Sequence, residues 1–206
     1  KELIGLVHKE VKPALGCTEP VAVALATAKA AELAEKSDQG FSRTGSRFKV
    51  NVEVSGNILK NGMGVGIPGT GMIGLRIAAA LGAICGKSGY GLEVLKDLDD
   101  DAIRMAKKLV ADGDVCINLA KNCHKLYVKV QVECGNTRTY AVIQDEHDKI
   151  IASGQGDAPA CEPMSHKHVN AGEDCRETSD YHLTVREIFD FATNADFDDI
   201  KFILED

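Results

Sequence analysis

Residues 21–35 read VAVALATAKAAELAE, and this run decides most of the fold. Alanine forms helix more readily than any other residue, and only Thr27 interrupts the helix-forming residues here. Pro20 stands directly before the run, at a position that suits the first turn of a helix. Because the side chains are small, we expect this helix to pack closely against another backbone. The same face is compatible with a homodimer.

The segment after this helix has the pattern of a β-strand. Residues 48–54 read FKVNVEV, and their apolar and polar side chains alternate with the period of two that gives a strand one buried face. Helices are then expected over 75–85 and 98–111. Four further strands are expected at 114–119, 125–134, 137–144 and 149–153, with turns at 135–136 and 147–148 that favour an antiparallel meander.

Shorter helices are expected at both ends of the chain, over 1–10, 184–193 and 197–204. This order predicts an α+β fold, with alanine-rich helices packed against a mostly antiparallel sheet, rather than a doubly wound α/β fold. We divide the 206 residues into a helical and glycine-loop part (1–112), a strand meander (113–155) and a part with a loop and terminal helices (156–206).

Composition excludes several classes of function. The chain has 24 basic and 31 acidic residues, a net charge of −7 that argues against binding nucleic acid or an anionic membrane. No apolar run approaches the length of a membrane span, and the first residues lack the apolar core of a signal peptide. Seven cysteines without regular spacing indicate free or metal-binding thiols in a reducing cytoplasm.

Cys17 is the first candidate site residue. It lies just before the long helix, where the helix dipole and free N–H groups favour a thiolate, the form that binds a metal or an iron–sulfur cluster. Thr18 or Glu19 is expected to cap the same helix end. A buried, inert thiol beside an ordinary cap would give the same sequence.

A glycine-rich segment, residues 56–74, is the second candidate. Backbone N–H groups of such a loop can hold a carboxylate or phosphate, with Lys60 adding positive charge and Asn57 and Asn61 adding amide donors. Turn formation alone also explains the glycines. The segment contains GTGMIG at 69–74, but we reject a dinucleotide site, because Pro68 and several glycines break the strand that should precede it.

A third candidate is the polar loop with Cys161, His166, His168 and Cys175. Two cysteines and two histidines could bind zinc, although the spacing lacks the close Cys pairs of structural zinc sites. A solvated loop is the simpler interpretation, and the sequence does not decide whether this loop binds metal.

The chain resembles the L-cysteine desulfidase family, which is also described as similar to the serine dehydratase alpha chain. The similarity rests on VKPALGCTEP at 11–20, SGNILKNGMGV at 55–65 and PGTGMIG at 68–74, with shorter matches at 91–96 and 200–204. This resemblance implies a lyase that converts L-cysteine to pyruvate, ammonia and sulfide with a [4Fe–4S] cluster. It carries over only Cys17 as a cluster ligand.

Members of that family are longer, and their other ligands lie in the later half, so the resemblance implies an N-terminal portion that holds no cluster and is inactive alone. We expect the partners to be the C-terminal half of the protein and a small amino acid. Asn57, Lys60, Asn61 and Thr70 are expected to bind its carboxylate; the α-proton base is not identified. L-serine dehydration, a binding module without chemistry, and a structural zinc domain on the third candidate loop remain the alternatives.

Overall fold

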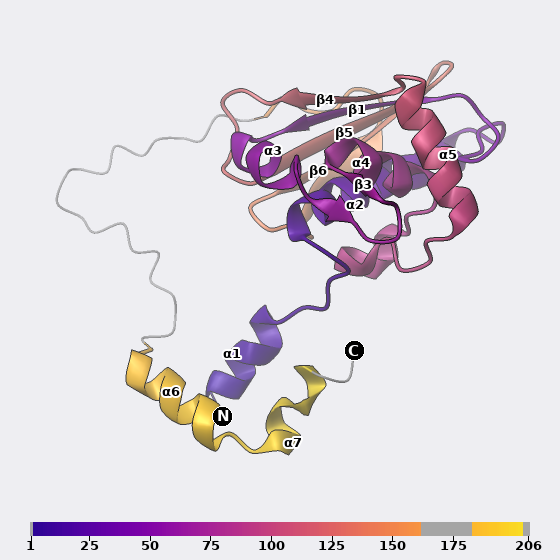
Figure 1. Ribbon diagram of the computed structural model, residues 1–206. Helices are drawn as coiled ribbons and strands as arrows, with labels where there is room; N and C mark the ends of the chain where they lie inside the picture. Colours follow the sequence, from indigo (N-terminus) through magenta and orange to yellow (C-terminus); the bar gives the residue numbers. More distant parts are fainter. Residues whose placement is uncertain (1, 162–182, 204–206) are drawn as a thin grey trace, which may run out of the picture. The chain divides into compact units, whose positions relative to one another are not determined.

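The computed structural model describes residues 2–161 and 183–203, which form two compact units. Residues 14–161 belong to the larger unit, and residues 2–13 and 183–203 belong to the smaller one. The expected division at residues 112 and 155 is therefore wrong, because the helices of the first part and the strands of the second share one core. Figure 1 shows the elements of each unit.

A five-stranded sheet forms the centre of the larger unit, with strand order β4-β1-β5-β6-β7. The pairs β1–β5, β5–β6 and β6–β7 are antiparallel, which confirms the mostly antiparallel α+β fold. The bounds are β1 (Lys49–Val54), β4 (Val115–Leu119), β5 (Tyr127–Cys134), β6 (Thr137–Gln144) and β7 (Ile150–Gln155).

The first strand of the expected meander is the exception. β4 pairs in parallel with β1, on the opposite side from β5, so that Val50 faces Val115. The chain between these two strands forms helices, and a helical crossover returns the next strand in the same direction. The meander therefore consists of β5, β6 and β7, and the part predicted to begin at residue 113 begins at β5.

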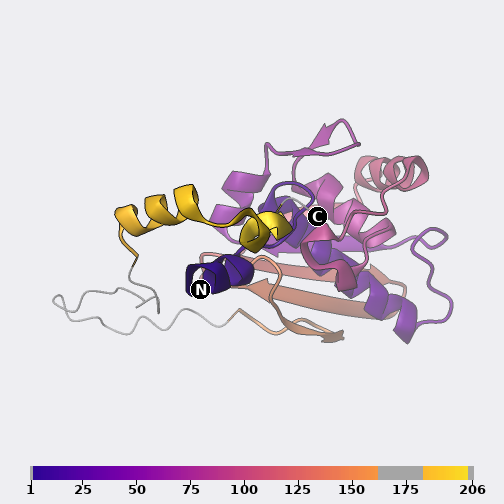
Figure 2. The ribbon, with the colours of Figure 1, turned by 90° about the horizontal axis from the view of Figure 1, so that it is seen from below.

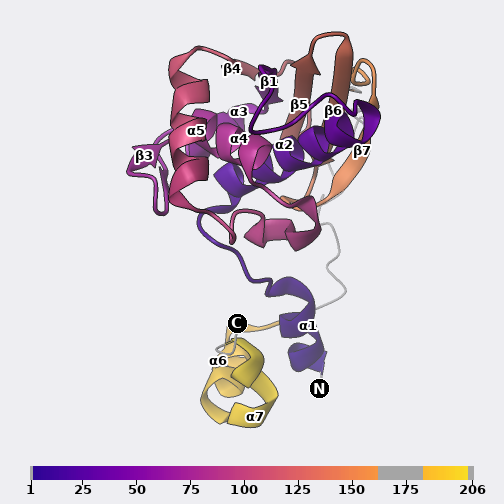
Figure 3. The same cartoon turned by 90° about the vertical axis from the view of Figure 1, so that its right-hand side faces the viewer.

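Three helices cover one face of the sheet, as Figures 2 and 3 show. They are α2 (Thr18–Ser37), α4 (Leu75–Ile84) and α5 (Asp100–Ala111). Val50, Val52 and Val54 of β1 are fully buried under them, whereas Asn51 and Glu53 between these valines are partly exposed. This alternation gives the sheet one apolar and one polar face, as the period of two in the sequence predicts.

The alanines of α2 allow it to approach α4 closely. A Cβ atom added to Gly82 of α4 would clash with the carbonyl oxygen of Ala24. The alanines at 22, 24, 26, 28, 30, 31 and 34 are at most 1% exposed. The expected close backbone contact is thus confirmed, and it lies inside the unit, so these alanines offer no face to a second copy of the chain.

The glycine-rich segment is more regular than expected. Residues 56–62 form a helix, α3 (Gly56–Gly62), and the next residues form a hairpin of β2 (Gly66–Ile67) and β3 (Met72–Ile73). The GTGMIG motif lies across this hairpin turn and its second strand, which supports rejecting a dinucleotide site. A short helix, η1 (Ser88–Glu93), follows α4.

The smaller unit contains α1 (Glu2–Glu10), α6 (Val185–Asn194), α7 (Phe197–Ile200) and η2 (Lys201–Ile203), as expected from the sequence. The rings of His8 and Phe202 stack with their centroids 3.8 Å apart. Thr184 and Glu187 form a capping box at the start of α6. Across the described residues of both units, no helix is long and apolar enough to cross a bilayer.

Candidate functional site

Cys17 is the residue at the N-terminal boundary of α2, and its side chain is exposed. Its thiol donates a hydrogen bond to the Oε2 atom of Glu19, 3.0 Å away. This hydrogen bond, together with partial desolvation, raises the pKa of the Cys17 thiol. The expectation that the helix end favours a thiolate is therefore wrong here, because the neighbouring carboxylate outweighs the helix dipole.

Glu19 connects Cys17 to α3. Its Oε1 atom accepts a hydrogen bond of 3.1 Å from Nδ2 of Asn61. The hydrogen bond from Cys17, and to a smaller extent that from Asn61, lowers the pKa of the Glu19 carboxyl. No side chain caps the backbone of α2, so the predicted capping role of Thr18 or Glu19 is wrong: Glu19 bonds to side chains instead.

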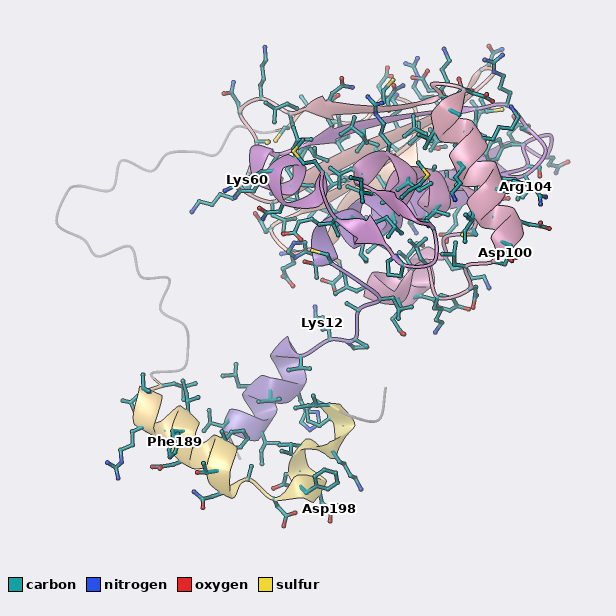
Figure 4. The ribbon with its side chains drawn as sticks, viewed as in Figure 1. Lys12, Lys60, Asp100, Arg104, Phe189 and Asp198 are labelled. Atoms are coloured by element: carbon teal, nitrogen blue, oxygen red, sulfur yellow. The ribbon has the colours of Figure 1, made fainter. Side chains whose placement is uncertain are left out.

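The short helix α3 presents three of the four predicted substrate-binding residues. Ser55 begins it, with an oxygen that accepts from the backbone of Ile58 and a hydroxyl that donates to the carbonyl of Lys125. Asn57, Lys60 and Asn61 are three and four positions apart, so they share one helix face, and all are exposed. Figure 4 shows the Lys60 side chain extending from α3 into solvent.

Thr70, the fourth predicted residue, does not join them. It is buried, and its hydroxyl donates to the carbonyl of Ile67 at 2.8 Å and accepts from the backbone of Met72 at 2.9 Å. Both bonds close the turn between β2 and β3. The structure therefore gives Thr70 a role in holding the hairpin.

A hollow lies beside Cys17, between its segment and the hairpin. Its volume is about 380 Å³, and its lining comes from residues 14–16, 67–69, Leu95, Lys96 and Leu98. Gly16 faces the ring of Pro68 across this hollow and has a φ of 106°, a backbone conformation that favours glycine. The conserved geometry of a tight approach here is local: it brings the residues just before Cys17 against the turn after β2.

His147 joins the site from the turn between β6 and β7, and sequence reasoning assigned it only to a turn. Thr137 and Thr139 of β6 donate hydrogen bonds to Asp38 and to the carbonyl of Ala30, so β6 runs antiparallel to α2. The 11 residues from Ala30 back to Glu19 span roughly 17 Å of helix, and β6 covers about the same length from Thr139 to its end. The turn thus reaches the level of Glu19.

The charge of His147 contributes to the lowered pKa of Glu19, which agrees with this placement. The sequence signal for this residue was weak. It lies far from Cys17 along the chain, and only the direction of β6 relative to α2 brings the two together.

The other thiols lie elsewhere in the larger unit. Burial raises the pKa of Cys85 to about 11, and its thiol bonds to the carbonyl of Leu81. Cys116 is exposed on β4, and Cys134 bonds to the carbonyl of Arg47. Among the described residues, no group of three or more histidine, cysteine or acidic side chains is arranged to hold a metal ion. Of the third candidate loop, His166, His168 and Cys175 lie outside the described residues.

The chain is similar to proteins named UPF0597. It is 45% identical to one from Bacteroides fragilis over all 206 residues, 44% identical to one from Parabacteroides distasonis over 205, and 41% identical to one from Shewanella pealeana over 203. These alignments cover 97–100% of the chain but 45% of each relative. The chain therefore spans a little under half the length of these relatives. No family model matches it, and no solved structure does.

These names correct the family expected from the sequence. The similar proteins are UPF0597 proteins, and no name of a cysteine desulfidase or a serine dehydratase is found among them. The motifs at 11–20 and 55–65 are features that this chain can share with UPF0597 proteins along their whole aligned length. They do not assign it to a named enzyme family.

Proposed function

We propose that the larger unit carries part of the active site of an amino-acid lyase. The reaction is the conversion of L-cysteine and water to pyruvate, ammonia and hydrogen sulfide. The observation that supports it best is the constellation at the start of α2, where a thiol, a carboxylate and an amide from two elements meet in one hydrogen-bonded group. Such a group at the surface of a unit, beside a hollow, is typical of a site that handles protons and ligands.

The proposed cofactor is a [4Fe–4S] cluster, and the described residues do not hold one on their own. Such a cluster needs several cysteine thiolates, and the described residues place a single thiol, Cys17, at this constellation. The remaining ligands would have to come from the rest of a longer protein. The relatives, of which the chain covers 45%, are long enough to supply them.

Glu19 gives Cys17 a proton acceptor. A thiol must lose its proton before its sulfur binds a metal, and the carboxylate at 3.0 Å is the group to which the proton is already hydrogen bonded. Asn61 holds the second oxygen of that carboxylate, so its direction is fixed. In this proposal Glu19 keeps the isolated thiol protonated and accepts its proton when the site is assembled.

The exposed face of α3 supplies the contacts for the substrate. An amino acid presents a carboxylate, which the ammonium of Lys60 and the amide of Asn57 can bind. Both side chains are exposed on the helix that contacts Glu19 through Asn61. A binding module without chemistry would use the same face, and L-serine would fit the same contacts, so both remain outcomes of the test.

We also propose that the reaction takes place in the cytoplasm. All six cysteines of the described residues are free thiols, which suits a reducing compartment.

The test uses the full-length protein, reconstituted anaerobically with iron and sulfide. Pyruvate and sulfide are measured from L-cysteine, and pyruvate from L-serine. We expect both products from L-cysteine, and their loss in Cys17→Ala but not in Cys116→Ala, which removes an exposed thiol on β4. Product from L-serine alone would change the substrate. A verified cluster with no product from either amino acid would overturn the lyase and favour the binding module.

A further inference from the structure

A histidine–aspartate pair lies at the same end of the sheet as Cys17. The Nδ1 atom of His124 is 2.8 Å from Oδ1 of Asp145. His124 belongs to the connection between β4 and β5, and Asp145 begins the turn after β6. A bond to Nδ1 fixes the ring and its tautomer, and no hydrogen bond of the described residues engages Nε2.

The backbone holds this pair in place. Asp145 has a φ of 69°, a left-handed conformation that is uncommon for a residue other than glycine. Its N–H donates to the carbonyl of Leu126 at 3.1 Å, which ties the turn to the connection that carries His124. Strained backbone of this kind persists only where its surroundings fix it, and it is frequent at functional sites.

Two links place the pair next to the Cys17–Glu19–Asn61 constellation. Asp145 is two residues from His147, which acts on Glu19, and two residues span at most about 7 Å. Lys125, the neighbour of His124, accepts a hydrogen bond from Ser55, the residue that begins α3. The pair and the constellation therefore belong to one end of the sheet, reached from four separate segments of the chain.

We propose that His124, oriented by Asp145, is the general base that removes the α-proton of the amino-acid substrate. This inference rests on the proposed lyase function and names the base that the sequence left unidentified. A side chain with 28% exposure, one ring nitrogen held by a carboxylate and the other unengaged has the arrangement of a proton acceptor.

The step balances as follows. The Nε2 lone pair takes the α-proton, and the electrons of the Cα–H bond form a double bond between Cα and Cβ. The Cβ–S bond breaks and hydrosulfide leaves with its electron pair. The proton on His124 passes to the hydrosulfide, giving hydrogen sulfide and 2-aminoacrylate. The aminoacrylate tautomerises to an imine, which water hydrolyses to pyruvate and ammonia.

The experiment compares three variants of the reconstituted full-length protein, His124→Gln, Asp145→Asn and Lys121→Gln. Lys121 is an exposed residue of the same connection and serves as the matched control. The measurements are kcat and KM for L-cysteine, and the exchange of its α-hydrogen with solvent deuterium. Thermal unfolding of each variant reports whether the fold is retained.

We expect His124→Gln to lower kcat by about 100-fold or more, with little change in KM, and to abolish α-hydrogen exchange. Added imidazole should restore part of both in His124→Ala. Asp145→Asn should lower kcat by less, and Lys121→Gln should match the unchanged protein. If His124→Gln keeps full turnover and exchange while the unchanged protein makes pyruvate and sulfide, the base is overturned and the lyase stands. If the unchanged protein makes no product, both are overturned.

Discussion

The thiol of Cys17 donates its proton to the carboxylate of Glu19 across 3.0 Å, within the first turn of α2. A cysteine at a helix N-terminus is ordinarily expected to be acidic, because the dipole stabilises the thiolate. Here the negative charge of Glu19 acts in the opposite direction and raises the pKa of the thiol. The site is thus arranged to keep an exposed sulfur protonated until another positive charge competes with the proton.

Replacing Glu19 with glutamine should make Cys17 more reactive. The neutral amide no longer stabilises the thiol form, so the pKa of Cys17 falls and more thiolate is present at neutral pH. We expect faster alkylation by iodoacetamide at pH 7, measured by mass spectrometry of the Cys17 peptide. Cys116, exposed on β4, is the internal control and should react at the same rate in both proteins. An unchanged rate at Cys17 would contradict the role of Glu19.

The same carboxylate should make stability depend on acidity. Hydrogen bonds from Cys17 and Asn61 lower the pKa of Glu19 below its unfolded value. A depressed carboxyl pKa stabilises the folded state above the unfolded pKa of about 4.3, and this contribution disappears as the pH falls through the lower folded value. Urea unfolding should therefore show Glu19→Gln less stable than the unchanged protein at pH 7. The difference should be small because Glu19 is only partly buried, and it should vanish at low pH; a pH-independent difference would refute the assignment.

Much of this fold follows from local sequence patterns. The alanine run predicts α2 and its close contact with another backbone, because small side chains leave nothing else to fill the space. The alternation at 48–54 predicts β1 and its buried face. The parallel position of β4 was missed because pairing direction depends on the path of the whole crossover, and no local pattern in residues 114–119 records it.

The site shows the same division. Cys17 was found because its position before a helix is visible in the sequence. Asn61 was found for its amide, but its partner Glu19 lies 42 residues earlier and was assigned to capping. His147 and the pair His124–Asp145 were missed because strand lengths and the direction of β6 bring them to this end of the sheet. Thr70 was predicted from a loop that proved to be a hairpin closed by its own hydroxyl.

The exposed face of α3 can be tested independently of Cys17. Replacing Lys60 with alanine removes the positive charge that we expect to bind the substrate carboxylate. In the full-length protein KM for L-cysteine should rise by about tenfold, since a charge-assisted hydrogen bond contributes about 1.5–3 kcal/mol. Lys107, exposed on α5, is the matched control, and Lys107→Ala should leave KM unchanged. Equal KM values in the two variants would remove α3 from the substrate site.

The contact between α2 and α4 should tolerate no added side chain. An added Cβ at Gly82 meets backbone atoms of Ala24, and backbone cannot move aside as a flexible side chain can. The two helices would have to separate, which loses contacts among the fully buried alanines and Ile77. Overpacking of this kind costs about 1–3 kcal/mol, and it outweighs the gain of about 1 kcal/mol that alanine brings to a helix.

Urea unfolding of Gly82→Ala should therefore show a net loss of stability of about 1–2 kcal/mol. Gly89→Ala is the control, because nothing lies within 4 Å of its added Cβ, and it should change the free energy of unfolding by no more than about 0.5 kcal/mol. A Gly82→Ala protein as stable as the unchanged one would show that α2 and α4 do not approach as closely as the alanine run requires. The position of Cys17 would then lose its support as well, because α2 is the helix that carries Cys17 and Glu19 to this end of the sheet.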